Sequence, residues 1–157
     1  EDDMLERTLQ GNVVAPFHLA RRLLPTLLAQ GGGQIINVCS GAGQYDPPVP
    51  ADQGGWGFAY GASKAALIRM AGCIRRELGG QGVRAYSVNP GVVATEAVTA
   101  TLGDDGTLAQ RYGALPPEAI AQALFWLATS PQAPAVARGK DMLDLPELVK
   151  TQGLWQP

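Results

Sequence analysis

The run "QIINVC", residues 34–39, most constrains the fold of this chain of 157 residues. It is largely apolar and rich in β-branched residues, and it lacks the alternation of a strand with one solvated face. It therefore predicts a strand that is covered on both faces, and such strands belong to parallel sheets. Parallel strands need crossover connections, which the helical segments on either side of this run can supply.

Helical and strand-like segments alternate along the rest of the chain. Apolar residues recur every three or four positions from Leu5 to Leu27, which predicts one long helix over residues 1–30. Pro16 should distort this helix near Asn12 and Val13, because its ring clashes with the carbonyl four residues back. We further expect a glycine- and proline-rich loop over 40–58, a helix over 59–79, a strand at "VRAYSVN" (83–89), a polar helix or loop over 97–112 and a helix from Pro117.

The order of these elements predicts an α/β fold with a parallel sheet. A chain of this length has room for one domain, and its 46% apolar content suits a globular protein. The net charge is −2 and the basic residues form no cluster, so nucleic acid and anionic membranes are not expected partners. Its apolar runs fall short of the roughly 20 residues that cross a bilayer, so no membrane span is expected.

The cysteines and the single histidine predict no metal site. Cys39 and Cys73 lie far apart and match no metal-ligand spacing, and His18 has no second histidine as a partner. A reduced, cytoplasmic setting is the simplest interpretation of two unpaired cysteines.

The stretch "YGASKAAL" places Tyr60 and Lys64 four residues apart in the predicted helix 59–79. Residues at this spacing lie on one helix face, with Cβ atoms about 6 Å apart. A free phenol has a pKa near 10, and a neighbouring ammonium favours its phenolate form. The pair can therefore serve acid–base chemistry, although such a pair is by itself also an ordinary solvated helix surface.

Four motifs in this order resemble the classical short-chain dehydrogenase/reductase family. They are "NVVAPFHLARRLLPTLL" from Asn12, "GGGQIINVCSGAG" with Ser40, "YGASKAAL" from Tyr60 and "VNPGVVATE" from Val88. The resemblance implies a Rossmann-type parallel sheet, with a nicotinamide cofactor, NAD or NADP, across the carboxyl ends of the strands. It also implies a small carbonyl or alcohol substrate.

The resemblance also implies roles for single residues. Tyr60 would give a proton to the carbonyl oxygen or take it from the alcohol, and Ser40 would hydrogen-bond that oxygen. Lys64 would bind the nicotinamide ribose and favour the phenolate, while Asn12 would hold a water that links Lys64 to solvent. Taken singly, Ser40 could instead cap a strand end, and Asn12 could be an ordinary polar helix residue.

The segment "PGVVAT" is implied to contact the cofactor. Pro90 and Gly91 would let the backbone approach the nicotinamide, Val93 would contact the carboxamide through main-chain atoms, and Thr95 would bond the carboxamide or a phosphate. Without the resemblance, Pro90 and Gly91 are consistent with an ordinary turn. Residues 96–115, short and polar, would form a lid over a modest substrate.

The chain departs from the family pattern in three places. The 40–60 loop is longer than usual, and the tail lacks the family's aspartate-glycine-glycine ending, so the last strand is expected within residues 135–143, around Gly139 and Lys140. The glycine-rich turn that seats the pyrophosphate is also absent. We therefore expect residues 1–157 to form a single partial domain, the carboxyl-terminal portion of a chain of about 250 residues. A natural truncation is the alternative.

Two other functions remain open at this point. A chain without the cofactor turn could be a non-catalytic interaction or dimerisation module. In the family the two long helices pair as homodimers or homotetramers, and here Ala62, Ala66 and Cys73 would permit close packing. The proline-rich loop before Tyr60 also suits the extended branch of the family, the nucleotide-sugar epimerases and dehydratases.

Overall fold

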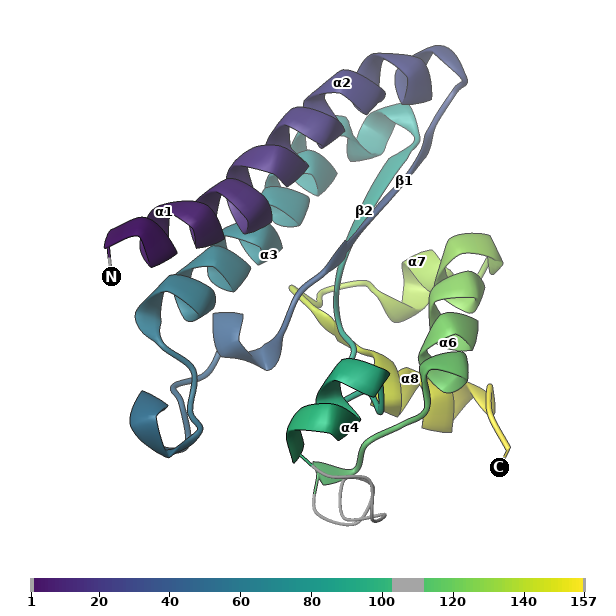
Figure 1. Ribbon diagram of the computed structural model, residues 1–157. Coiled ribbons are helices and arrows are strands. Elements are labelled where there is room, and N and C mark those ends of the chain that lie inside the picture. Colours follow the sequence, from purple (N-terminus) through teal and green to yellow (C-terminus); the bar gives the residue numbers. More distant parts are fainter. Residues whose placement is uncertain (1, 103–111, 157) are drawn as a thin grey trace. The chain divides into compact units, whose positions relative to one another are not determined.

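A computed structural model describes residues 2–102 and 112–156 of the chain. The chain divides into two compact units, Glu1–Val88 and Asn89–Pro157. In Figure 1 the first unit runs from purple to teal and the second from green to yellow.

The first unit contains the elements that the sequence predicts, each shifted by at most a residue or two. The long helix runs through residues 2–29 without interruption, and the strand and the second helix each begin one residue before their predicted positions. The elements are α1 (Asp2–Leu9), a π-helical turn (Gln10–Val14), α2 (Ala15–Ala29), β1 (Gly33–Val38), α3 (Phe58–Leu78) and β2 (Val83–Asn89), of which only Asn89 belongs to the second unit.

The π-helical turn lies where Pro16 was expected to distort the long helix. Pro16 has no N–H, so it cannot donate to the carbonyl of Asn12 as an α-helical residue would. At this point the Ala15 N–H bonds to the carbonyl of Gln10, five residues back. The predicted distortion is therefore present as one wide turn, and such turns occur frequently at functional sites.

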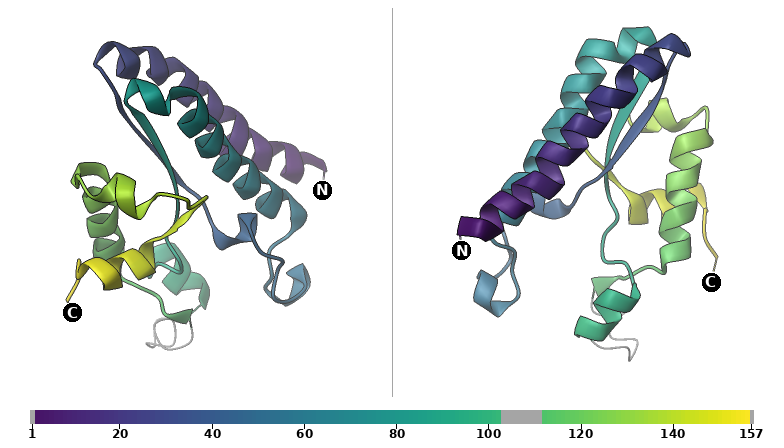
Figure 2. Two further views of the ribbon diagram at one scale, coloured as in Figure 1. Left: turned by 180° about the vertical axis from the view of Figure 1, so that it is seen from behind. Right: turned by 45° about the horizontal axis from the view of Figure 1, so that its top comes forward.

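The core of the first unit lies between the two long helices and one face of the paired strands. β1 and β2 are parallel, with Ile35 opposite Ala85. Figure 2 shows α2 and α3 on the same side of these strands. Small and β-branched residues fill the contact, which lets the helices approach the strands closely: Ala20, Ala71, Ile74, Val83 and Ala85.

Two glycine turns set the start of both strands. Gly82 has a left-handed φ of +82°, and a Cβ there would lie 2.5 Å from the carbonyl oxygen of Gly31. A Cβ on Gly32 would lie 2.4 Å from the carbonyl oxygen of Gly82. Only glycine permits this approach, so the two turns touch and β1 and β2 begin opposite each other.

The second unit is built around a pair of helices. α6 and α8 pack together, and each turns small or branched apolar residues inward, such as Ala123 on α6 and Leu148 on α8. The unit contains α4 (Glu96–Leu102), α6 (Pro117–Thr129), α7 (Ala133–Val136), β3 (Leu143–Asp144) and α8 (Leu145–Gln152). The helix predicted from Pro117 is thus confirmed.

The last strand was predicted within residues 135–143, and of that range only Leu143 belongs to it. The residues around Gly139 and Lys140 form a turn after α7, in which Gly139 takes a left-handed φ of +76°. The strand lies instead at Leu143–Asp144, and α8, which was not predicted, follows it directly. The predicted lid over 96–115 begins as α4, and its residues 103–111 lie outside the described residues.

Within residues 2–102 and 112–156, no helix has both the length and the apolar character needed to cross a membrane.

Candidate active site

Tyr60 and Lys64 lie one turn apart near the start of α3. The Lys64 Nζ is 5.6 Å from the centre of the Tyr60 ring. The same Nζ donates a hydrogen bond of 3.3 Å to the carbonyl oxygen of Val38, the last residue of β1. Tyr60 is 41% exposed. The pair therefore lies at the carboxyl end of β1, with a phenol and an ammonium on one side of the helix.

Asn12 reaches the same part of α3 from the π-helical turn. Its Nδ2 donates to the Ser63 Oγ over 3.1 Å, and that hydroxyl donates to the Tyr60 carbonyl oxygen over 2.8 Å. Asn12 and Lys64 also line one open groove of about 560 Å³ on the first unit. The structure thus brings Asn12 and the Tyr60–Lys64 pair together through a hydrogen-bonded serine.

Ser63 was not identified from the sequence as a functional residue. It is completely buried, and it joins Asn12 to the helix that carries Tyr60 and Lys64. One sequence signal could have identified it. Its position falls on the same helical stripe as the buried Leu67 and Ile74, where a polar residue needs a hydrogen-bond partner.

Ser40 follows β1 by two residues and begins a short turn that packs on α3. Its Oγ accepts a hydrogen bond of 3.2 Å from the Ala42 N–H and so caps the turn Gly41–Gly43. A Cβ on Gly43 would lie only 2.7 Å from the Ala65 N and the Lys64 C. The turn after Ser40 is therefore in direct contact with the α3 backbone next to Lys64.

Cys39, between β1 and Ser40, is a buried thiol. It is 3% exposed, and its Sγ donates to the carbonyl oxygen of Asn37 over 3.4 Å. Burial raises the pKa of Cys39, and a hydrogen bond with Ser87, the charge of Lys64 and a backbone hydrogen bond with Val88 offset this only in part. A thiol of this kind packs as a small apolar side chain.

The predicted nicotinamide contacts lie together in the second unit, on the connection between β2 and α4. Gly91 takes a left-handed φ of +66°, which favours glycine there. Val93 forms an isolated parallel bridge with Leu115. The Thr95 Oγ1 accepts from the Val98 N–H over 3.3 Å, at the start of α4. Pro90, directly before Gly91, is half-buried.

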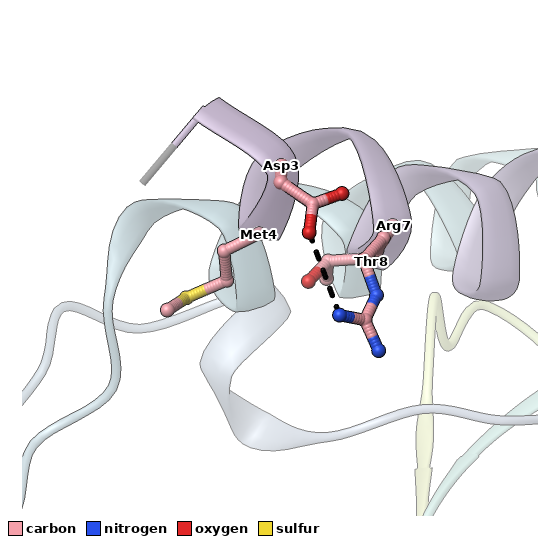
Figure 3. Close-up of a pocket in the computed structure, with 4 residues that line it drawn as sticks. All are labelled: Asp3, Met4, Arg7 and Thr8. Atoms are coloured by element: carbon pink, nitrogen blue, oxygen red, sulfur yellow. Dashed lines mark hydrogen bonds and ion pairs between the residues drawn. The ribbon is translucent and has the colours of Figure 1, made fainter.

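A further surface pocket lies entirely on α1 and is lined by Asp3, Met4, Arg7 and Thr8 (Figure 3). Its polar contact is an exposed ion pair of 3.5 Å between Arg7 Nη1 and Asp3 Oδ2. An exposed pair four residues apart on a helix contributes about 0.3–0.5 kcal/mol to stability, so it is a helix-surface feature. In the part of the chain that the structure describes, no three histidine, cysteine or acidic side chains gather as metal ligands would.

The chain is similar to known proteins over most of its length. The family model described as short chain dehydrogenase matches residues 1–105. The fatty acyl-CoA reductase Rv0547c of Mycobacterium tuberculosis is 34% identical over 146 residues, which cover 89% of this chain and 45% of that relative. The chain therefore spans about half the length of the curated relatives that it matches.

Two solved structures at 28% identity are similar in fold to most of the chain. An angucycline C-6 ketoreductase, LanV, with bound NADP superposes with a TM-score of 0.72, covering 92% of this chain and 53% of that one. A 4-hydroxyisoleucine dehydrogenase complexed with NADH gives a TM-score of 0.65 and covers 92% of this chain and 59% of that one. The predicted α/β fold of Rossmann type is confirmed.

Proposed function

This chain belongs to the short chain dehydrogenase family. We propose that it forms the catalytic part of an NAD(P)-dependent oxidoreductase that interconverts a carbonyl and a secondary alcohol. The observation that carries the proposal is the pairing of Tyr60 and Lys64 on α3, with 5.6 Å between the ammonium and the ring centre. The turn after Ser40 packs on the same helix beside this pair.

The donor set of the first unit suits the ribose of a nicotinamide cofactor. An ammonium can donate three hydrogen bonds, and that of Lys64 uses one on the carbonyl oxygen of Val38. The others can reach ribose hydroxyls. In this proposal the backbone of Gly91 in the second unit, which takes a left-handed φ of +66°, would contact the nicotinamide ring. When bound, the cofactor supplies or accepts the hydride.

The chain's own residues move the proton and orient the substrate. Tyr60 donates its phenolic proton to the carbonyl oxygen in reduction and accepts it back in oxidation, which is general acid–base catalysis. Ser40 hydrogen-bonds the same oxygen and holds it near the phenol. Lys64 stabilises the negative charge that develops on the phenol oxygen.

Asn12 completes the path to solvent in this proposal. Its side chain donates to the Ser63 hydroxyl, and its main-chain carbonyl would hold a water near Lys64. Pro16 has no N–H, so it cannot form the usual α-helical bond to that carbonyl.

Residues 90–95 of the second unit contribute the remaining cofactor contacts in this proposal. Pro90 and Gly91 would lie against the nicotinamide, Val93 would bond its carboxamide through main-chain atoms, and the Thr95 hydroxyl would donate a hydrogen bond to the carboxamide or a phosphate. We further propose a cytoplasmic location, which suits the two free cysteines Cys39 and Cys73, and a homodimer or homotetramer.

The test is a Tyr60→Phe substitution in the protein expressed from its natural gene. Turnover of a panel of ketones and aldehydes should fall by about 10²–10⁴-fold, because the general acid is lost. Binding of NADH or NADPH, followed by nicotinamide fluorescence, should stay within about twofold, since the phenol ring remains.

Tyr45→Phe is the matched control. Tyr45 is 69% exposed in the loop after Ser40, so the same loss of a hydroxyl there should leave turnover unchanged. Equal turnover of the Tyr60→Phe variant and the unmodified protein would rule out the proposed role of the phenol.

A further inference from the structure

A directional chain of hydrogen bonds joins the Pro90–Gly91 segment to the first turn of α8. The Gly91 N–H donates to Asn89 Oδ1 over 3.2 Å, and Asn89 Nδ2 donates to Asp144 Oδ2 over 3.1 Å. The second carboxylate oxygen, Asp144 Oδ1, accepts the Glu147 N–H over 3.0 Å and so caps α8. All these residues belong to the second unit.

The direction of this chain follows from the chemistry of its ends. A backbone N–H can only donate and a carboxylate can only accept. The amide of Asn89 must therefore turn its oxygen to Gly91 and its nitrogen to Asp144. Asp144 therefore accepts two hydrogen bonds, one from the Asn89 side chain and one from the Glu147 N–H of α8.

A close packing contact reinforces the same connection. Gly91 has φ +66°, and a Cβ on it would lie 2.8 Å from Cγ of Pro146, the second residue of α8. The first turn of α8 thus lies directly against the Gly91 backbone. The tail that departs from the family's usual ending supplies both the hydrogen-bond acceptor and the packing surface.

We propose that Asp144 is a positioning residue that acts through Asn89 to fix the Pro90–Gly91 backbone where the nicotinamide ring is held. This inference rests on the proposed function, in which that backbone contacts the cofactor. Asp144 touches neither cofactor nor substrate in this scheme. Its effect is on how well the backbone is preorganised for binding.

Single and paired substitutions test this series of hydrogen bonds by changing the donor and the acceptor of the bond between Asn89 and Asp144. In Asp144→Asn, the new amide still caps α8 with its oxygen, because Asn and Asp cap helices equally well. Its NH₂ group then faces the NH₂ group of Asn89, and a flip of Asn89 would set that NH₂ group against the Gly91 N–H. In Asn89→Asp, two carboxylates face each other instead.

The double variant Asn89→Asp/Asp144→Asn should restore all three bonds. Asp at position 89 accepts from Gly91 and from the new amide at position 144, whose oxygen still caps α8. Each single variant should weaken NAD(P)H binding about three- to tenfold, the effect of losing one hydrogen bond of ordinary net strength, since the bonds at Asn89 are exposed to solvent. The double variant should return to within about twofold of the unmodified protein.

Amide hydrogen exchange at Gly91 gives a readout that is independent of cofactor. Exchange should be faster in both single variants and slow again in the double variant, while thermal unfolding midpoints stay close together. Glu147→Gln is the control, because it removes a carboxylate from the same helix turn and keeps the backbone N–H that Asp144 accepts.

Two failures can be told apart. If the unmodified protein binds neither NADH nor NADPH, the proposed function fails and the positioning role fails with it. If it binds cofactor, and both single variants bind it as tightly and protect Gly91 as well, only the role of Asp144 is overturned. Additive losses in the double variant would overturn it as well.

Discussion

At the scale of single residues, the site depends on polar groups whose partners are distant in sequence. Ser63 is three residues from Tyr60 and one from Lys64. Its hydroxyl accepts a hydrogen bond from the Asn12 side chain, and so connects the first long helix to the helix that carries Tyr60 and Lys64. Tyr60 and Lys64 could be paired from their spacing alone. From the sequence, Asn12 could be assigned to the same site only through the resemblance of its surrounding motif to the family. The sequence around a polar helix residue does not indicate which distant residue it bonds to.

Cys39 gives a residue-scale prediction about reactivity. In a Cys73→Ser variant it is the only thiol within residues 1–157, and we expect its alkylation by iodoacetamide at pH 8 to be about a hundredfold slower than in denaturant. Burial limits access, and because it also raises the pKa of Cys39, less thiolate is present at this pH. Mass spectrometry of the labelled protein measures the rates. Rapid labelling of the native variant would contradict the buried position.

At the scale of elements, glycine contacts hold the turn after Ser40 on α3. The Gly41–Gly43 turn approaches the helix backbone beside Lys64 so closely that no side chain fits at Gly43. The sequence marked this loop as glycine-rich without indicating what it packs against. Loop glycines carry no periodicity, so only the packed structure shows which of them are required.

Gly43→Ala tests this contact. The added methyl group would meet the backbone atoms Ala65 N and Lys64 C at 2.7 Å, and backbone atoms cannot rotate away. We expect the free energy of unfolding to fall by about 1–3 kcal/mol, the usual cost of overpacking, as measured by urea denaturation. Gly80→Ala is the control, since nothing lies within 4 Å of its Cβ position. Equal stability of the two variants would show that the turn can move away without cost.

At the scale of the whole molecule, the proposed oligomer depends on a helix face that the first unit leaves uncovered. Leu67 and Ile74 of α3 are buried in that unit, whereas Ala66 is partly exposed and Cys73 is exposed. Small residues on such a face permit close approach of a second helix. The assembly therefore stays a prediction that one substitution can test.

Ala66→Arg should disrupt this assembly. A long charged side chain on the pairing face would separate the helices and leave its charge without a partner, so we expect monomers at concentrations where the unmodified protein is dimeric or tetrameric. Light scattering coupled to size-exclusion chromatography measures the mass. Ala29→Arg, at the exposed end of α2, is the control. An unchanged mass for Ala66→Arg would show that subunits associate elsewhere.

The sequence by itself determined the elements and the pair at the centre of the site. Periodicity is local, so the long helix, β1, α3, β2 and α6 were predicted within about two residues of their ends, and a four-residue spacing was enough to pair Tyr60 with Lys64. The tertiary structure decided which side chains far apart in the sequence form hydrogen bonds with each other. Asn12 bonds Ser63 from 51 residues away, and Asn89 bonds Asp144 from 55.

The tail shows the physical reason for this division. Its strand is two residues long and its last helix eight, too short for local preference to outweigh packing. The position of β3, the start of α8 and the role of Asp144 as an acceptor follow from what these segments contact. Local sequence encodes which elements form, and the packing of distant segments decides which side chains meet.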